Sequence, residues 1–250
     1  MKISLIGFGK MGKMIKEKAI SHGHEISSII DPFSEQADFK DITSESVCDA
    51  DVCIEFTNPD CALSNIKKLI MLDKHIVVGT TGWYKDINKI QAAIEKSSSG
   101  FVYGSNFSPG MHVFKKITDY SSKLFAKISD YDVAGIEIHH SEKIDSPSGT
   151  ANVLSDIIIK NNPIKQRLLT NSIDRKVAAE EFQFTSVRTG KVPGIHKIMF
   201  DSDADTVEIS HTARNREGFA LGAIIAAEFI NRKTGFYNIE TIFDEIMEGK

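Results

Sequence analysis

The first hundred residues alternate short apolar runs with segments of helical character. The apolar runs are expected to be buried strands, because each ends in glycine or a small polar residue; they span 3–6, 26–30, 52–56, 75–78 and 100–103. Helices are expected between them, at 13–21, 60–72 and 87–96. Repeated strand–loop–helix units predict a parallel sheet that is covered by helices on both faces.

The pattern changes after about residue 109. Helices are expected at 112–127 and 151–160, and alternating, strand-like runs at 131–140, 182–188, 196–201 and 206–211. The last three runs are consecutive, which favours a mixed or antiparallel sheet with one open face. A strongly apolar helix at 218–230 is expected to pack back on the first domain. The fold class is therefore α/β, with one domain built from 1–108 and 218–250 and a smaller α+β domain from 109–217.

Composition excludes several classes of function. The chain has 250 residues, 41% of them hydrophobic and 26% charged, with a net charge of −4. This charge gives no basic footprint, so we expect no nucleic-acid partner. The apolar run at the N-terminus is too short for a signal peptide, and the uncharged stretch 218–227 is too short to span a bilayer. We therefore expect a cytoplasmic protein that does not interact with membranes.

The three cysteines add little chemistry. The spacings of Cys48, Cys53 and Cys61 fit no zinc site or redox pair. An odd, small number suits a reducing compartment, and the expectation is that these thiols are buried.

A glycine loop follows the first expected strand. It has the pattern GxGxxG and consists of Gly7, Phe8, Gly9, Lys10, Met11 and Gly12. The glycines allow a tight turn and let the backbone approach a pyrophosphate, which the N–H groups at the following helix start would bind. A glycine turn without a ligand is the simpler alternative. The strand before the loop and the helix after it favour a Rossmann-like dinucleotide-binding domain.

An acid at the end of the second strand supports this interpretation. Asp31 could accept hydrogen bonds from a ribose diol. It is followed by Pro32 and Phe33, so no arginine stands beside it to hold a ribose 2′-phosphate. We therefore expect NADH to be preferred over NADPH, although Lys10 could supply a charge for the phosphate.

The segment 139–150 reads HHSEKIDSPSGT and concentrates candidate chemistry. Adjacent histidines on a strand point to opposite faces, so His139 and His140 can serve one ligand only if the strand ends there. Ser148 precedes an apolar helical stretch and is a plausible N-cap. The N–H groups of Gly149 and Thr150 would then be free to bind a carboxylate at the positive helix end.

Lys143 and the histidines extend the site. Taken singly, each is more often a solvated or hydrogen-bonded residue without a function. Together, a lysine ammonium suits a second carboxylate or a proton transfer, and a histidine can donate a proton near neutral pH. The segment therefore predicts a site for a small dicarboxylate that needs protonation. It holds too few carboxylates, without regular ligand spacing, for a metal, and we expect none.

The segment 137–151 is similar to the signature E-x-H-H-x-x-K-x-D-x-P-S-G-T-A of dihydrodipicolinate reductases, also called 4-hydroxy-tetrahydrodipicolinate reductases. The resemblance covers the whole chain and includes the glycine loop, VGTTG at 78–82, SNFS at 105–108 and segments between 187 and 219. It implies NAD(P)H-dependent reduction of 4-hydroxy-tetrahydrodipicolinate to tetrahydrodipicolinate, with loss of water, in diaminopimelate and lysine biosynthesis.

The resemblance also implies residue roles. His139 corresponds to the proton donor, Lys143 to an essential lysine, and His140, Gly149 and Thr150 to substrate contacts. The dinucleotide would be lined by the glycine loop, Asp31 and two further groups, namely Gly79, Thr80 and Thr81, and Gly104, Ser105, Asn106 and Phe107. A homotetramer built through the sheet of the second domain is expected. Pro32 departs from the family, because many relatives have a basic residue after the acid.

Two other functions remain alternatives. Another two-domain oxidoreductase, such as an amino-acid dehydrogenase, would share the N-terminal architecture. A non-enzymatic sensor that binds NADH would also use the glycine loop, but it would not need the His-His-Lys cluster.

Overall fold

The computed structural model describes residues 1–171 and 173–249. The chain divides into two compact units, one formed by residues 1–109 with the segment from Arg216 onward and the other by Gly110–Asn215. The predicted limits differ slightly, because the division falls at 109 instead of 108 and at 216 instead of 218.

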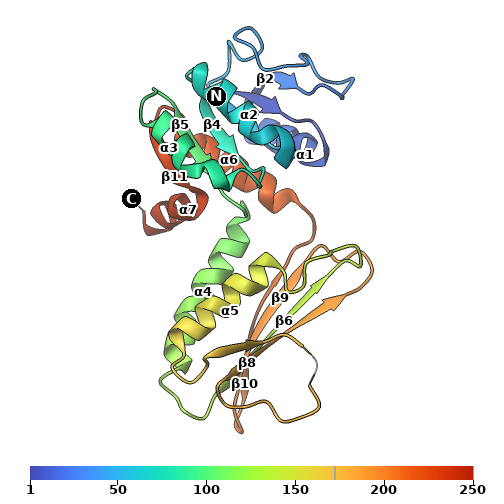
Figure 1. Ribbon diagram of the computed structural model, residues 1–250, viewed down its shortest axis with the longest axis vertical. Helices are drawn as coiled ribbons and strands as arrows, with labels where there is room; N and C mark the ends of the chain where they lie inside the picture. The colour runs from blue at the N-terminus through green and yellow to red at the C-terminus, as the bar shows by residue number, and fades with distance from the viewer. Residues whose placement is uncertain (172, 250) are drawn as a thin grey trace. The chain divides into compact units, whose positions relative to one another are not determined.

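The first unit is an α/β layer structure (Figure 1). In chain order it contains β1 (Lys2–Ile6), α1 (Lys10–Ser21), β2 (Glu25–Ile30), β3 (Val52–Glu55), α2 (Pro59–Met71), β4 (His75–Val78), the short 3₁₀ helix η1 (Tyr84–Asp86), α3 (Ile87–Ile94), β5 (Gly100–Tyr103), α6 (Glu217–Ile230), β11 (Gly235–Asn238) and α7 (Ile239–Glu248).

Its sheet has six described strands in the order β11-β5-β4-β3-β1-β2, and all of its pairs are parallel. The chain leaves β1 toward β2 on one side and returns to β3 on the other, so the direction of winding reverses beside β1. Ligands of such sheets bind beyond the carboxyl ends of the strands at this reversal. The glycine loop follows β1 and lies at this position.

Both faces of this sheet are buried, as the continuous apolar runs predict. One face packs Ile3 and Leu5 of β1 against α1, α6 and α7. The opposite face packs Ile6 of β1 and Cys53 of β3 against α2 and α3. The alternation of side chains along β1 therefore supplies both cores. Helix α6 packs on the first unit, which confirms the prediction for 218–230.

The second unit is α+β. It contains α4 (Pro109–Phe125), β6 (Asp132–His139), α5 (Gly149–Asn161), β7 (Arg167–Leu169), β8 (Glu181–Arg188), β9 (Ile195–Asp201) and β10 (Thr206–Thr212). Its five described strands run in the order β10-β9-β6-β8-β7, with parallel pairs among β6, β8 and β7 and antiparallel pairs among β6, β9 and β10. The sheet is therefore mixed.

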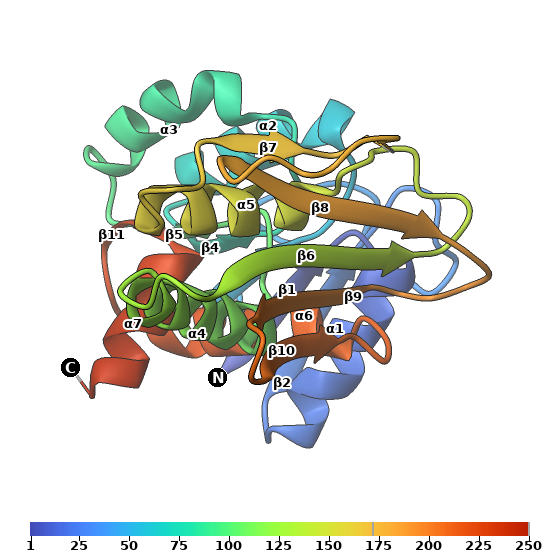
Figure 2. The ribbon, with the colours of Figure 1, turned by 90° about the horizontal axis from the view of Figure 1, so that it is seen from below.

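One face of this sheet carries α4 and α5 (Figure 2). The core includes Phe114 of α4, Leu154 of α5 and three phenylalanines of the sheet, Phe182, Phe184 and Phe200. Along β6 buried residues alternate strictly with partly exposed ones, which places the second face of the sheet outside this core.

Several elements differ from the predictions. Helix α4 begins at Pro109 and not near His112, because proline lacks an N–H and is favoured in the first helical turn. Strands β7 and β11 and helix α7 were not predicted, because each is short or follows a turn without a clear period. The expectation of buried thiols is wrong for Cys48, which is exposed, whereas Cys53 is buried and Cys61 is intermediate. Among the described residues, none of the helices combines the length and apolar character that crossing a membrane requires.

Candidate functional site

The glycine loop joins β1 to α1, and its glycines are required by space. Gly7 has φ = +91°, a conformation that favours glycine, and a Cβ there would overlap the carbonyl of Phe56. A Cβ on Gly12 would overlap the carbonyl of Gly7. Gly9 is different, because no atom lies within 4 Å of its Cβ position. Gly9 is also the N-cap of α1, so the helix start behind it is open to an anion.

Asp31 is part of the same loop system. Its carboxylate accepts the N–H groups of Phe8, at 2.7 Å, Phe33, at 2.8 Å, and Ser34, at 2.9 Å. Burial opposes its ionisation, but these donors and the charge of Lys40 hold the pKa of Asp31 below its ordinary value. Asp31 therefore fixes the glycine loop as well as presenting a charge near it.

Lys40 was not identified from the sequence, because it lies nine positions after the acid. Its Nζ donates to the carbonyl of Ser34, at 2.7 Å. A cation thus lies near Asp31 although Pro32 is not basic. No local pattern in the sequence indicates that the loop after β2 folds back in this way.

The other predicted dinucleotide residues follow β4 and β5 at the same edge of the sheet. They are Gly79, Thr80 and Thr81 after β4 and Gly104, Ser105, Asn106 and Phe107 after β5. Thr80 accepts the N–H of Thr57 on its hydroxyl, at 2.7 Å, and the indole N–H of Trp83 on its carbonyl, at 2.9 Å. Asn106 accepts the N–H of Ser108, at 3.0 Å. These side chains fix the loops that surround the expected dinucleotide.

Glu55, at the end of β3, was not predicted. Its side chain is fully buried and is hydrogen-bonded to the hydroxyl of Thr57 and the amide of Asn65. Burial raises the pKa of Glu55, which favours a neutral acid in this position. It supports the loop after β3 and is not exposed to a ligand.

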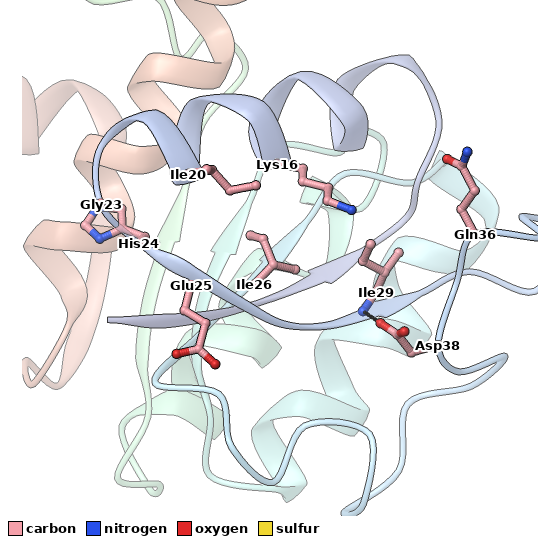
Figure 3. A pocket seen from close by; sticks show the side chains of 9 residues that line it. All are labelled: Lys16, Ile20, Gly23, His24, Glu25, Ile26, Ile29, Gln36 and Asp38. Carbon is pink, nitrogen blue, oxygen red and sulfur yellow. Dashed lines mark hydrogen bonds between the residues drawn. The ribbon is translucent and has the colours of Figure 1, made fainter.

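A surface pocket of the first unit lies elsewhere, beside α1 and the start of β2 (Figure 3). Lys16, Glu25, Gln36 and Asp38 are among its polar residues, and Asp38 accepts the N–H of Ile29, at 2.8 Å. None of the predicted dinucleotide residues lines it. We therefore assign no part of the candidate site to this pocket.

In the second unit, β6 ends at His139, as the use of both histidines requires. His139 is 7% exposed, and His140 lies just beyond the strand and is partly exposed. Lys143 is in the loop that follows, where its Nζ contacts both carboxylate oxygens of Asp145, at 2.7 and 2.9 Å. In the free protein the Lys143 ammonium is therefore paired with the exposed carboxylate of Asp145.

Ser148 is the N-cap of α5, which confirms the helix start inferred from the sequence. Its hydroxyl accepts the N–H of Ala151, at 3.1 Å. Gly149 is exposed, and no atom lies within 4 Å of its Cβ position. The first turn of α5, with the N–H groups of Gly149 and Thr150, therefore presents an open, positive helix end.

Glu137 organises this site, and the sequence interpretation gave it no role of its own. In the register of the sheet it is paired with Ser186 on β8 and with His196 on β9. One oxygen, Oε1, accepts the Ser148 N–H at 2.9 Å, the Ser186 hydroxyl at 2.7 Å and the Arg188 guanidinium at 2.9 Å. The other, Oε2, lies 3.3 Å from His139 Nδ1 and 3.5 Å from His196 Nε2. A charged residue at a core position of an alternating strand is the signal that could have identified it.

The electrostatics follow from this geometry. Burial alone would raise the pKa of Glu137, but the nearby His196 ring and the hydrogen bonds from Ser148 and Ser186 hold it far below its ordinary value. Burial lowers the pKa of His139 to about 4; Glu137 opposes this shift, whereas His196, Lys143 and Arg188 add to it. At neutral pH the free protein therefore holds an ionised Glu137 beside a neutral His139.

Glu137, His139 and His196 offer ligand atoms that lie within 4.8 Å of one another, a spacing that a metal ion could use. The Arg188 guanidinium is hydrogen-bonded to the same carboxylate, and a dication would be repelled by it. We therefore assign no metal ligands among these residues, and the absence of a metal remains a prediction.

Comparison with known proteins identifies relatives over nearly the whole chain. The family described as "Dihydrodipicolinate reductase, N-terminus" matches residues 1–107, and "Dihydrodipicolinate reductase, C-terminus" matches residues 110–243. The 4-hydroxy-tetrahydrodipicolinate reductase of Christiangramia forsetii is 35% identical over 248 residues, which cover 99% of this chain and 100% of the relative. The enzyme of the same name from Staphylococcus aureus is 32% identical and covers 97% and 100%.

Solved structures agree on the fold. A dipicolinate-bound dihydrodipicolinate reductase from Paenisporosarcina sp. TG-14 matches with a TM-score of 0.77 and 21% identity over 97% of this chain and 99% of that one. An amine dehydrogenase from Mycobacterium smegmatis matches with a TM-score of 0.61 and 10% identity, over 96% and 95%. The predicted fold, a Rossmann-like unit with a second mixed sheet, is confirmed.

Proposed function

The chain belongs to the dihydrodipicolinate reductase family, and from this we propose how its residues carry out the reaction. It is an NAD(P)H-dependent oxidoreductase, a 4-hydroxy-tetrahydrodipicolinate reductase of diaminopimelate and lysine biosynthesis. The reaction converts 4-hydroxy-tetrahydrodipicolinate to tetrahydrodipicolinate with loss of water. Because the chain belongs to this family, we set aside the alternatives of an amino-acid dehydrogenase and a non-enzymatic sensor.

The proposed substrate site is in the second unit. One observation carries it: the Glu137 carboxylate binds the N–H of Ser148 at the start of α5 and also lies beside His139. The anion-binding helix start and the proton donor therefore meet at one carboxylate, through the hydrogen bond from Ser148 and the 3.3 Å approach of His139 Nδ1. Gly149 and Thr150 would hold one substrate carboxylate through their N–H groups, and His140 would contact the substrate from the end of β6.

Lys143 is proposed to hold the second carboxylate and to take part in proton transfer. In the free protein its ammonium is paired with Asp145, which is exposed. A substrate carboxylate would replace Asp145 as the partner, so the cation is kept in place without a buried, unpaired charge. When bound, the nicotinamide supplies a hydride, and the negative charge that develops on the ring nitrogen of the substrate needs a cation and a proton donor. His139 and Lys143 are proposed for these roles.

The dinucleotide is proposed to bind at the glycine loop of the first unit. Gly9 leaves space at the start of α1, and the loops after β4 and β5 are fixed at the same edge. We propose NADH as the preferred cofactor, because the ionised Asp31 would repel a 2′-phosphate. Lys40 opposes this preference, since it brings a cation near the acid. Steady-state rates with NADH and NADPH, measured for the natural protein and for Lys40→Ala, test the proposal. A natural enzyme with a higher kcat/KM for NADPH would contradict it.

The variant Lys143→Ala tests the proposed role of this lysine in the substrate site of the second unit. We expect kcat/KM to fall by roughly 10²-fold or more, with unchanged NADH affinity measured by fluorescence. Lys123→Ala is a matched control, because Lys123 is also a lysine of the second unit paired with an aspartate, at 2.5 Å from Asp119. Activity retained in Lys143→Ala would remove the proposed role of this lysine.

Assembly and location are proposals as well. The face of the second sheet that is not covered by α4 and α5 is available for subunit contacts, and we propose a homotetramer built through it. Light scattering coupled to size exclusion would measure the mass directly. A cytoplasmic location is supported by three unpaired cysteines, as expected in a reducing compartment.

A further inference from the structure

Glu137 is a fully buried carboxylate for which the proposed reaction has no direct use. Burying an ionised carboxylate is costly unless each of its oxygens has partners. Oε1 meets this requirement with three donors, Ser148, Ser186 and Arg188. Among the described residues, Oε2 has the two histidine rings near it, at 3.3 and 3.5 Å, and it has no hydrogen-bond partner in the free protein. Oε1 is thus held by hydrogen bonds that stabilise the fold, whereas Oε2 faces His139 and His196.

The geometry at His139 distinguishes its two ring nitrogens. Glu137 and His139 are two residues apart on β6, so their side chains lie on the same face of the sheet. An anionic oxygen opposite Nδ1 favours the tautomer that carries its proton there. Nε2 is next to Gly194, where a Cβ would come within 3.0 Å of it. The missing side chain at Gly194 therefore leaves space beside Nε2.

This tautomer raises a difficulty for the proposed proton donor. A neutral ring with its proton on Nδ1 has only a lone pair on Nε2, and it cannot donate there. The charged groups around the ring come from every neighbouring element: Glu137 on β6, Arg188 on β8, His196 on β9 and Lys143 in the loop after β6. Of these, only Glu137 favours the imidazolium. A proton must therefore arrive on Nε2 together with additional negative charge.

We propose that Glu137 is a positioning residue, which holds the Nδ1 proton of neutral His139 and becomes the counter-ion of the imidazolium that forms when the dicarboxylate binds. The proposal rests on the proposed role of His139 as the proton donor. Solvent supplies the proton to Nε2 as the dianionic substrate enters. On reduction, the Nε2–H bond breaks and a new bond to hydrogen forms on the substrate, while the electron pair stays on Nε2. His139 returns to its neutral form with its remaining proton still on Nδ1, facing the Glu137 carboxylate.

The test is Glu137→Gln, with dipicolinate as the dicarboxylate probe and NADH present. Glutamine keeps one acceptor oxygen for the three donors, but its amide donates toward the histidines. Calorimetry in two buffers of different ionisation enthalpy gives the protons taken up per dipicolinate bound. At pH 7 we expect about half a proton or more for the natural protein and less than about a fifth for Glu137→Gln. We expect kcat/KM to fall roughly 10²-fold and the alkaline limb of its pH profile, where the acid loses its proton, to move to lower pH, with NADH affinity unchanged.

Ser186→Ala is the matched control. It removes one donor to Oε1 but keeps the charge and position of Oε2, so proton uptake should be retained. Proton uptake and a pH profile in Glu137→Gln equal to those of the natural protein would overturn the proposal. Activity retained in His139→Asn would instead remove the proposed role of His139, and the two failures are therefore distinguishable.

A second measurement does not depend on the folding of any variant. Spectra of the natural protein with ¹⁵N-labelled histidine report which ring nitrogen of His139 carries the proton. We expect Nδ1–H in the free protein and both nitrogens protonated with dipicolinate and NADH. An Nε2–H tautomer in the free protein, or no change on binding, would overturn the proposal.

Discussion

The start of α5 offers a measurable link between one hydroxyl and the proposed substrate site. Ser148 is 3% exposed, caps the helix through the Ala151 N–H and contacts His196 Nε2 at 3.3 Å. Replacing Ser148 by alanine removes the hydroxyl and leaves the backbone contact to Glu137 in place. The change therefore isolates the cap and the histidine contact.

The expected cost is the sum of these two contacts. Loss of an N-cap costs about 1 kcal/mol. Loss of the hydroxyl partner of a buried ring nitrogen costs about 1 kcal/mol more, because His196 keeps its approach to Glu137 Oε2 at 3.5 Å. We therefore expect Ser148→Ala to reduce the free energy of unfolding of the second unit by about 2 kcal/mol. Fraying of the helix start should also weaken dipicolinate binding by about tenfold, since 1.4 kcal/mol corresponds to that factor.

Ser155→Ala is the control, because it makes the same substitution in the same helix at a similarly buried position. The Ser155 hydroxyl donates to the Ala151 carbonyl, at 2.8 Å, a contact that adds little to a helix interior. Its change in unfolding free energy should stay within about 0.5 kcal/mol. Guanidinium unfolding followed by circular dichroism measures the stability of both variants, and hydrogen exchange at residues 151 and 152 reports the helix start. Equal stability and equal exchange in the two variants would refute the assignment of Ser148 as an energetically important cap.

Three further predictions concern the first unit. Gly12→Ala should destabilise the protein strongly, because its Cβ has no space beside the loop. Gly9→Ala should lower the melting temperature much less, because it loses only the preference for glycine at the N-cap, and it should weaken NADH binding by about tenfold or more. Thermal unfolding and fluorescence titration measure both effects. Burial would raise the pKa of Asp31, but the backbone donors outweigh it and lower the pKa in the folded protein. Ionised Asp31 therefore stabilises the folded protein fully above the pKa of the unfolded chain, about 3.9. This stabilisation is lost as the pH falls through the lower pKa of the folded protein. The stability advantage of the natural protein over Asp31→Asn, measured by thermal unfolding, should therefore shrink in acid. A thiol reagent should modify the exposed Cys48 quickly and reach Cys53 only on unfolding, because burial raises the pKa of Cys53 to about 12.

The fold of the first unit was predictable because its signals are local. Each strand is a short apolar run that ends in a loop residue, and the glycine loop is recognisable from the spacing of its own glycines, although Asp31 and the carbonyl of Phe56 also contact it. Strand β7 could not be found in this way, since three residues at a sheet edge are held mainly by their pairing with β8. Strand β11 is fixed by β5, more than a hundred positions earlier in the chain. Such elements depend on partners, which a periodic pattern does not contain.

The residues of the candidate site differ in the same way: some can be predicted from local sequence, and others depend on distant partners. His139, Lys143, Ser148 and Gly149 fall within eleven positions, so their joint chemistry can be read from one segment. The contacts of Glu137 with donors on β8 and β9 depend on the register of three strands. A shift by one residue would turn Glu137 to the other face and separate it from them. The residue types were visible in the sequence, but their assembly around one carboxylate was not.

The charges of this assembly explain why a histidine, and not a permanent cation, stands beside Glu137. In the free protein Glu137 and Asp145 balance Arg188 and Lys143, and a neutral His139 adds nothing. A lysine or arginine at position 139 would add a buried positive charge before any substrate arrived, and that charge would be unbalanced. A dicarboxylate brings two negative charges, and a group that takes up a proton at that moment restores part of the balance. The ordinary pKa of histidine allows both the neutral and the protonated ring near neutral pH. His139 can therefore be neutral in the free protein and act as an acid only when the substrate is bound.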